Sequence, residues 1–263
     1  MSEAADEREG DGPAPLLEEP VSGLCYRVRR TALAAFPESR ELQELRALRE
    51  ALGATSAPIA RVLLLHGVGG NETDLAAMAA WLDPAIEVLL VRGPLVLGPS
   101  QFAWFRVSFS ARGPVVNAEQ AEQSRARLLA LIHTLHEQDG ATPCVTIVAG
   151  FSQGGILSAS VGLSAPREVA AFAMLSGRIL PELEPAIAPR DALRTLSAFV
   201  AHGRFDDRLP VSWAERACAQ LDALGVRHRA EIYPIGHELS DIVVAGFRRW
   251  LDDTLACEPR AAR

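Results

Sequence analysis

Short apolar runs alternate along the chain, from residue 59 onward, with stretches in which apolar residues recur at helical spacing. Two of the runs, RVLLL at 61–65 and VTIVA at 145–149, are almost wholly apolar, as expected of strands buried on both faces. The expected strands are 61–65, 86–91, 145–149, 170–175, 198–200 and 229–233, and the expected helices are 74–82, 117–138, 154–163, 211–224 and 240–255. This alternation predicts an α/β fold with a mostly parallel central sheet and helices on both faces.

Other segments do not follow this alternation. Residues 24–32 have the pattern of a first edge strand or a hairpin arm, and residues 41–52 have leucines and alanines at helical spacing. Residues 92–116 are rich in Gly, Pro and aromatic residues, which is typical of a long functional loop. No internal repeat or linker interrupts residues 24–255. We therefore expect a single domain over 21–258 without a large lid domain, preceded by an acidic, disordered tail over 1–20.

Composition narrows the classes of function. The chain has 263 residues, of which 49% are hydrophobic, and a formal net charge of −7. It has no basic patch with interleaved aromatic residues, so nucleic-acid binding is not expected. The acidic balance also argues against docking on anionic lipid. No apolar run reaches the length of a membrane span and no secretory signal opens the chain, so we expect no membrane insertion and a cytoplasmic location.

The cysteines give no sign of a metal site. Cys25, Cys144, Cys218 and Cys257 are scattered along the chain and lack the spacing of metal ligands. We interpret them as inert thiols in a reducing cytoplasm. Neither a metal nor an organic cofactor is expected.

The most informative motif is Gly-Phe-Ser-Gln-Gly at 150–154, which follows an apolar strand and precedes a helix rich in small residues. A serine lifted above a sheet needs a tight turn from strand to helix, and glycines allow the flanking backbone to pack that closely. The start of the helix also points backbone N–H groups at developing negative charge. The alternative is a serine that caps a helix after a glycine turn. The strand–turn–helix context favours Ser152 as a nucleophile.

A nucleophilic serine needs a base, which is usually a histidine held by a carboxylate. Of the six histidines, His237 has the appropriate place, in a loop that follows a late strand. His202 opens the segment HGRFDDRLP, which follows another strand and supplies Asp206 and Asp207 as candidate acids. Asp241 is a weaker candidate. His66, His133, His136 and His228 are better explained as loop, helix-face or solvent residues.

The oxyanion hole of such an enzyme needs two backbone donors near the serine hydroxyl. One is expected to be the N–H of Gln153, which follows the nucleophile. The other is expected in the turn His66–Gly70, where glycines allow N–H groups to face inward. An ordinary Gly-rich turn is the structural alternative. A phosphate-binding loop fits less well, because no Lys-Ser/Thr pair follows.

Together these motifs resemble the phospholipase/carboxylesterase family, which includes acyl-protein thioesterases and small bacterial carboxylesterases. The matching pieces are LLLHGVGGNETDL (63–75), AGFSQGGILS (149–158), HGRFDDRLP (202–210) and YPIGHELS (233–240). Four motifs in the family's order relate the region from about residue 59 to 255 to it. The resemblance implies an α/β-hydrolase fold.

The resemblance also assigns roles to residues. It makes Ser152 the nucleophile, His237 the base and Asp206, not Asp207, the acid, and it places one oxyanion N–H on Val68. Residues 91–114 resemble the loop that shapes the acyl site, which makes Trp104 and Phe105 candidates for its wall. Plain core packing is the alternative for both aromatic residues. Dimerisation is common in this family, so a homodimer is one expectation.

The expected function is that of a serine carboxylesterase that hydrolyses small-molecule esters with short or medium acyl groups through an acyl-enzyme. Little sequence is left for a lid, because a helix, a strand and a Pro-rich loop at 181–189 fill the stretch before the acid. An acyl thioesterase or a lysophospholipase would use the same residues. A peptidase is disfavoured because no gating domain is visible, and a non-catalytic binding protein is disfavoured because every candidate catalytic group is present.

Overall fold

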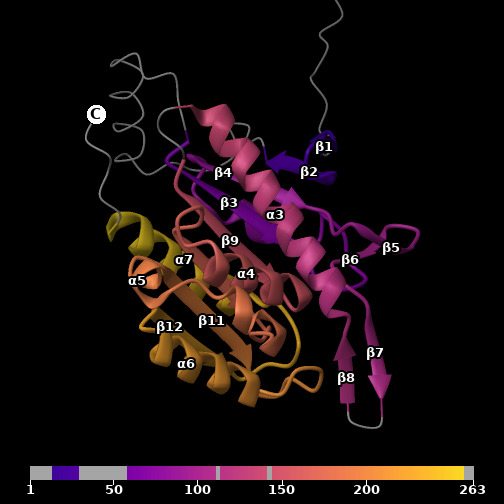
Figure 1. The fold of residues 1–263 in the computed structure, drawn as a ribbon, viewed down its shortest axis with the longest axis vertical. Helices are drawn as coiled ribbons and strands as arrows, with labels where there is room; N and C mark the ends of the chain where they lie inside the picture. Colours follow the sequence, from indigo (N-terminus) through magenta and orange to yellow (C-terminus); the bar gives the residue numbers. More distant parts are fainter. Residues whose placement is uncertain (1–13, 30–57, 111–112, 141–143, 258–263) are drawn as a thin grey trace, which may run out of the picture.

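The computed structural model describes residues 14–29, 58–110, 113–140 and 144–257. The helix expected at 41–52 and most of the tail expected at 1–20 lie outside these ranges. Eight strands form the central sheet in the order β1-β2-β4-β3-β9-β10-β11-β12 (Figure 1). They are β1 (Leu17–Glu19), β2 (Leu24–Arg29), β3 (Ala60–Leu65), β4 (Ile86–Val91), β9 (Thr146–Phe151), β10 (Ala171–Leu175), β11 (Ser197–Gly203) and β12 (Arg227–Tyr233).

The sheet is mostly parallel, as the sequence predicts. All pairings from β4 through β12 are parallel, and only β1 with β2 and β2 with β4 are antiparallel. The strand expected at 24–32 is β2, which is a hairpin arm because β1 pairs with its outer side and takes the edge position. The carboxyl ends of the six parallel strands therefore meet at one edge of the sheet, where sites in such folds collect.

Helices cover both faces, which explains why the central strands are apolar throughout. Successive side chains of β3 point to opposite faces. Val62 and Leu64 pack with the helices α2 (Ala76–Ala80) and α7 (Asp241–Cys257). Leu63 and Leu65 pack on the other face. That face is covered by α3 (Ala118–Asp139), α4 (Gln153–Ser164) and α6 (Ser212–Leu224), and α3 and α4 lie across the sheet in Figure 1. The short elements η1 (Pro181–Ala186) and α5 (Arg190–Leu193) connect β10 to β11.

Residues 92–116 are more regular than the long loop that their composition predicts. They form two hairpins, β5 (Leu95–Gly98) with β6 (Gln101–Ala103) and β7 (Val107–Ser110) with β8 (Gly113–Val116). The β7–β8 hairpin extends away from the body of the molecule (Figure 1). The Gly and Pro residues that indicate a loop lie at hairpin turns and strand ends, while β-branched and aromatic residues form the short ladders between them.

A strand lies inside the range that the composition predicts to be a disordered tail. Leu17–Glu19 form β1 inside the range 1–20 that the sequence analysis assigns to a disordered tail. The turn that follows is fixed by Glu19, whose carboxylate accepts the N–H groups of Val21 at 2.9 Å and Ser22 at 2.5 Å. Acidic composition alone therefore misjudged this boundary, because a carboxylate can stabilise a tight turn.

The helix expected at 74–82 is shorter in the structure, where α2 spans only Ala76–Ala80. None of the helices in the described ranges has the length and apolar run that a membrane crossing requires.

Candidate active site

Ser152 occupies a strained turn between β9 and α4. Its φ is 55°, a left-handed value that is costly for a residue with a side chain. The turn also demands close backbone packing: a Cβ at Gly154 would lie 2.0 Å from the carbonyl oxygen of Leu65, and one at Gly150 would lie 2.3 Å from the carbonyl carbon of Gly154. The N–H of Ser152 donates to the carbonyl of Leu175 at 2.8 Å, which ties the turn to β10.

His237 and Asp206 form a continuous hydrogen-bonded chain with Ser152. The Nε2 atom of His237 lies 3.0 Å from Ser152 Oγ, and its Nδ1 atom lies 2.7 Å from Asp206 Oδ2. His237 comes from the loop between β12 and α7, and Asp206 comes from the loop that follows β11. The structure thus brings together three residues that are widely separated in the sequence, in the arrangement of a nucleophile, a base and an acid.

The surroundings of Asp206 separate it from Asp207. The side chain of Asp206 is fully buried, whereas that of Asp207 is 86% exposed. The Oδ1 atom of Asp206 accepts the N–H groups of Arg208 at 2.9 Å and Leu209 at 2.8 Å, which leaves Oδ2 directed at His237. The buried His202 donates from Nε2 to the carbonyl of Leu209 at 2.7 Å and so supports the same loop.

The turn after β3 is held in place by His66. The ring donates from Nδ1 to the carbonyl of Gly67 at 2.7 Å and accepts the N–H of Gly93 at Nε2 at 2.9 Å. Burial lowers the pKa of His66, so the ring is neutral and suits this pair of bonds. His66 therefore supports the loop, as the sequence analysis expects.

The two expected oxyanion donors, the N–H groups of Val68 and Gln153, have no hydrogen-bond partner in the described part of the chain. The turn that carries Val68 lies directly against Ser152, because a Cβ at Gly67 would be 3.4 Å from the Cβ of Ser152. Gln153 follows Ser152 at the start of α4, where N–H groups are free to donate.

Trp104 and Phe105 do not form an exposed wall. Both side chains are fully buried and belong to the core on the α3/α4 face, which is the alternative that the sequence analysis leaves open. The Trp104 indole N–H donates to the carbonyl of His66 at 2.9 Å and so stabilises the turn that contains Val68.

The side chain of Gln153 has a role that its place in the motif does not reveal. It accepts the N–H of Trp104 at 3.1 Å and donates to the carbonyl of Phe105 at 2.8 Å. It therefore fixes the 104–105 backbone against the first turn of α4. No periodicity or spacing in the sequence indicates this contact, because it joins residues almost fifty positions apart.

A cavity of about 260 Å³ lies next to Phe151, the residue that precedes Ser152. Its lining includes Gly67, Val68, Phe151 and Leu239, together with residues at the start of α2. Phe151 also packs on the ring of His237, with centroids 4.8 Å apart. Phe151 and Leu239 lie within the motifs GFSQG and YPIGHELS, but the sequence pattern alone does not indicate that they line a cavity.

The sequence profile of the family described as Phospholipase/Carboxylesterase matches residues 53–254. The match includes the strands and loops that carry Ser152, Asp206 and His237. The chain belongs to the phospholipase/carboxylesterase family. This family is one of hydrolases, and the order of its motifs in the sequence predicts the membership correctly.

Relatives within the phospholipase/carboxylesterase family are distant. The chain is 26% identical over 221 residues to a probable carboxylesterase of Oryza sativa subsp. japonica, a match that covers 77% of this chain and 92% of that protein. It is 26% identical over 203 residues to acyl-protein thioesterase 1 of Gibberella zeae, covering 70% and 86% of the two chains. Among solved structures, a carboxylesterase from Mesorhizobium loti superposes with a TM-score of 0.68 at 22% identity, over 92% of this chain and 99% of that one.

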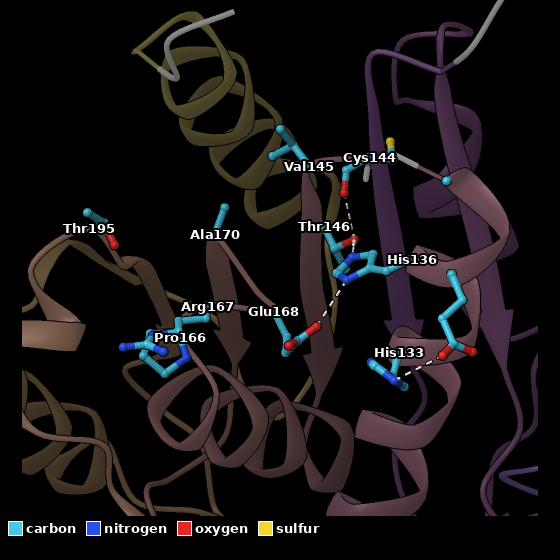
Figure 2. A pocket seen from close by; sticks show the side chains of 12 residues that line it. His133, His136, Cys144, Val145, Thr146, Pro166, Arg167, Glu168, Ala170 and Thr195 are labelled. Carbon is cyan, nitrogen blue, oxygen red and sulfur yellow. Dashed lines mark hydrogen bonds and ion pairs between the residues drawn. The ribbon is translucent and has the colours of Figure 1, made fainter. Parts of the chain in front are cut away.

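A second, larger cavity lies away from these residues. It measures about 610 Å³ and is lined by residues of α3 and by the segments that lead into β9 and β10 (Figure 2). Thr146 begins β9 and lines this cavity, whereas Ser152 follows the last residue of β9, so the two sites are about 20 Å apart along the strand. His136 lies there between Glu168 and Thr146, at 3.0 and 2.9 Å, with both ring nitrogens paired. Among the described residues, no group of His, Cys, Asp or Glu is arranged to hold a metal ion.

Proposed function

We propose that this protein is a serine carboxylesterase, with Ser152 as nucleophile, His237 as base and Asp206 as acid. The observation that carries the proposal is the chain of contacts from Ser152 Oγ through His237 to Asp206, at 3.0 and 2.7 Å. Both distances are within hydrogen-bond reach, as proton transfer requires. Membership of a hydrolase family agrees with it.

In the proposed reaction, His237 takes the proton of Ser152 as Oγ attacks the carbonyl carbon of an ester. Asp206 keeps the proton of His237 on Nδ1, so Nε2 is free to accept. The N–H groups of Val68 and Gln153 stabilise the oxyanion of the tetrahedral intermediate. The alcohol leaves with the proton from His237, and a water molecule then repeats the sequence on the acyl-enzyme and releases the acid.

The size of the adjoining cavity supports short or medium acyl groups. The cavity of about 260 Å³ has apolar walls at Val68, Phe151 and Leu239. Between Ser152 and Asp206 the chain forms only α4, β10, η1, α5 and β11, and none of these is a large lid. The rates of a series of p-nitrophenyl esters are therefore expected to peak at short or medium chains. A steady rise to long chains would instead favour a lysophospholipase.

An acyl thioesterase is the second candidate, because one relative is named acyl-protein thioesterase 1. The same three residues would cleave a thioester by the same steps. Parallel rates on an oxygen ester and a thioester of the same acyl group measure the preference.

The deciding experiment is hydrolysis of p-nitrophenyl acetate and butyrate by the wild-type protein and by the Ser152→Ala variant. Turnover is expected in the wild type and should fall to the background rate in the variant, because the alanine has no hydroxyl to acylate. Circular dichroism controls for folding of the variant. Full activity of the variant would show that Ser152 is not the nucleophile.

Cellular location and assembly stay predictions. The described cysteines Cys25, Cys144 and Cys218 are free thiols, which supports the proposed cytoplasmic location. A homodimer remains an expectation that analytical ultracentrifugation can measure.

A further inference from the structure

The guanidinium group of Arg178 lies over an aromatic ring. Arg178 follows β10, and its Cζ atom lies 4.6 Å from the ring centroid of Trp213 in α6. Arg216 also lies over this ring, with its Cζ atom 4.9 Å from the centroid. An arginine stacked on an indole is held in one orientation, so less conformational entropy is lost when its N–H groups bind a partner.

The backbone places Arg178 at the same edge of the sheet as Ser152. The carbonyl of Leu175, three residues before Arg178, accepts the N–H of Ser152 at 2.8 Å. Gly177 packs on the first turn of α4, since a Cβ there would lie 3.1 Å from the N atom of Ile156. Arg178 therefore leaves the sheet directly next to the turn that carries the nucleophile.

Trp213 is tied to the same edge from the other side. The backbone N–H of Trp213 donates to the carbonyl of Pro210 at 2.9 Å. Leu209, the residue before Pro210, donates its backbone N–H to Oδ1 of Asp206 at 2.8 Å. The arginine and the ring on which it rests thus extend from two segments that also hold the nucleophile and the acid.

Arg178 has no carboxylate partner in the described ranges. It is partly buried, between the buried Gly177 and Ile179, yet it makes no hydrogen bond or ion pair with any described residue. Burial lowers the pKa of Arg178, although the charge of Glu182 opposes this effect. A partly desolvated cation without a partner is unusual, because burial of charge is normally compensated by pairing.

We propose that Arg178 binds an anionic group of the substrate, so that the preferred esters carry a carboxylate or a phosphate in addition to the ester bond. This inference rests on the proposed serine-hydrolase function. The planar guanidinium matches both anions through paired N–H donors. The net charge of −7 would by itself repel such substrates, so a preference for them isolates the local effect of the cation.

The test compares two esters that differ only at the far end of the acyl chain, p-nitrophenyl hexanoate and the mono-p-nitrophenyl ester of adipic acid. The wild type is expected to have a kcat/KM about tenfold higher for the anionic ester, as one charge-assisted hydrogen bond provides. Half-molar NaCl should reduce this ratio, since part of the interaction is screened.

Three variants test whether Arg178 causes the preference, measured as the ratio of kcat/KM for the anionic ester to kcat/KM for the neutral ester. Arg178→Met is expected to lower the ratio about tenfold, and Arg178→Lys should retain part of it because the charge remains. Arg194→Met removes an exposed arginine of the connection between β10 and β11 and should leave the ratio unchanged. Inhibition of hexanoate hydrolysis by inorganic phosphate and by free adipate shows which anion binds better.

The outcomes separate the two proposals. If neither ester is hydrolysed, the proposed hydrolase function fails. If both are hydrolysed and the wild type shows no preference for the anionic ester, the anion site is refuted while the hydrolase function stands. A preference that persists in Arg178→Met also refutes it. If Arg178→Met does not fold, the Lys variant and the salt dependence of the wild type decide.

Discussion

At the scale of single residues, Asp206 divides its contacts between two oxygen atoms. Oδ1 accepts two backbone N–H groups, from Arg208 and Leu209, and Oδ2 faces Nδ1 of His237. The backbone bonds set the orientation of the carboxylate. The other oxygen is thereby committed to the histidine, and it dictates which ring nitrogen of His237 carries the proton.

The Asp206→Asn variant tests this division. The amide is expected to keep its oxygen on the two backbone N–H groups and to present an NH₂ group to His237, which favours the tautomer with the proton on Nε2. That ring cannot accept the proton of Ser152, so kcat is expected to fall about a thousandfold or more with a small change in KM. Asp207→Asn is the matched control, because that side chain is 86% exposed. Equal losses in both variants would contradict the assignment.

The residues of this site differ in how readily they can be recognised from the sequence. Ser152 and His237 stand in short motifs whose context can be recognised from the chain, whereas the choice between Asp206 and Asp207 needed a family resemblance. The role of Trp104 was harder to predict. An aromatic residue in the core and one in the wall of a pocket look the same in the sequence and differ only in burial. The contacts of the Gln153 side chain depend on the packing of distant segments, which no local pattern encodes.

At the scale of elements, the approach of α4 to β3 determines the position of Ser152, the proposed nucleophile. The helix begins so close to the strand that Gly154 has no room for a side chain. The start of α4, with its free N–H groups, is therefore fixed relative to the turn that carries Val68.

The Gly154→Ala variant tests this contact. A Cβ would lie 2.0 Å from the backbone oxygen of Leu65, so the helix must shift away from the strand. We expect a loss of about 3 kcal/mol in the free energy of unfolding. Because a shift of about 1 Å misplaces reacting groups, we also expect kcat/KM to fall by about a hundredfold. Urea unfolding and ester hydrolysis measure the two effects. Gly98→Ala should change neither, since its nearest neighbour is the end of the flexible Gln101 side chain at 3.3 Å.

Elements with strong periodicity were predicted well and short ones poorly. The sequence places β4 and α3 almost at their observed bounds. It misses the two hairpins of 92–116, because strands of three or four residues are too short to show an alternating pattern.

At the scale of the whole molecule, one carboxylate joins three separate segments. Glu72, whose side chain is only 2% exposed, follows β3 and pairs with Arg27 of β2 at 2.9 Å and with Arg92, which follows β4, at 2.6 Å. Arg92 also lies over the ring of Phe102 in β6, 4.5 Å from its centroid. Burial alone would raise the pKa of Glu72, but the hydrogen bonds from Arg92 and Arg27 outweigh it and lower the pKa to about 2.

This lowered pKa predicts a specific dependence of stability on pH. The ordinary pKa of Glu72 is 4.5, so its contribution is complete above about pH 4.5 and is lost as the pH falls toward about 2. Glu72→Gln is expected to lower the free energy of unfolding by about 2 kcal/mol at pH 7, since it leaves two arginines unpaired. The difference from wild type should shrink as the pH falls below 4.5. Urea unfolding at several pH values measures it, with the exposed Glu137→Gln as control. A constant difference would contradict the prediction.

The global arrangement was the most predictable level. Alternating strands and helices predict a mostly parallel sheet with both faces covered, whereas the order of the strands was not predicted. The cavities were not predictable, because their volumes depend on how side chains from several elements meet.

The order of strands in the sheet has a consequence for the time at which the proposed active site is completed during folding. His237 follows β12, which joins the sheet through β11 alone among the described strands. Until that pairing forms, Ser152 lacks the base that the proposed mechanism requires. With the proposed function, a partly assembled chain is expected to be inactive toward esters, and the onset of hydrolysis would report that the final strand has docked.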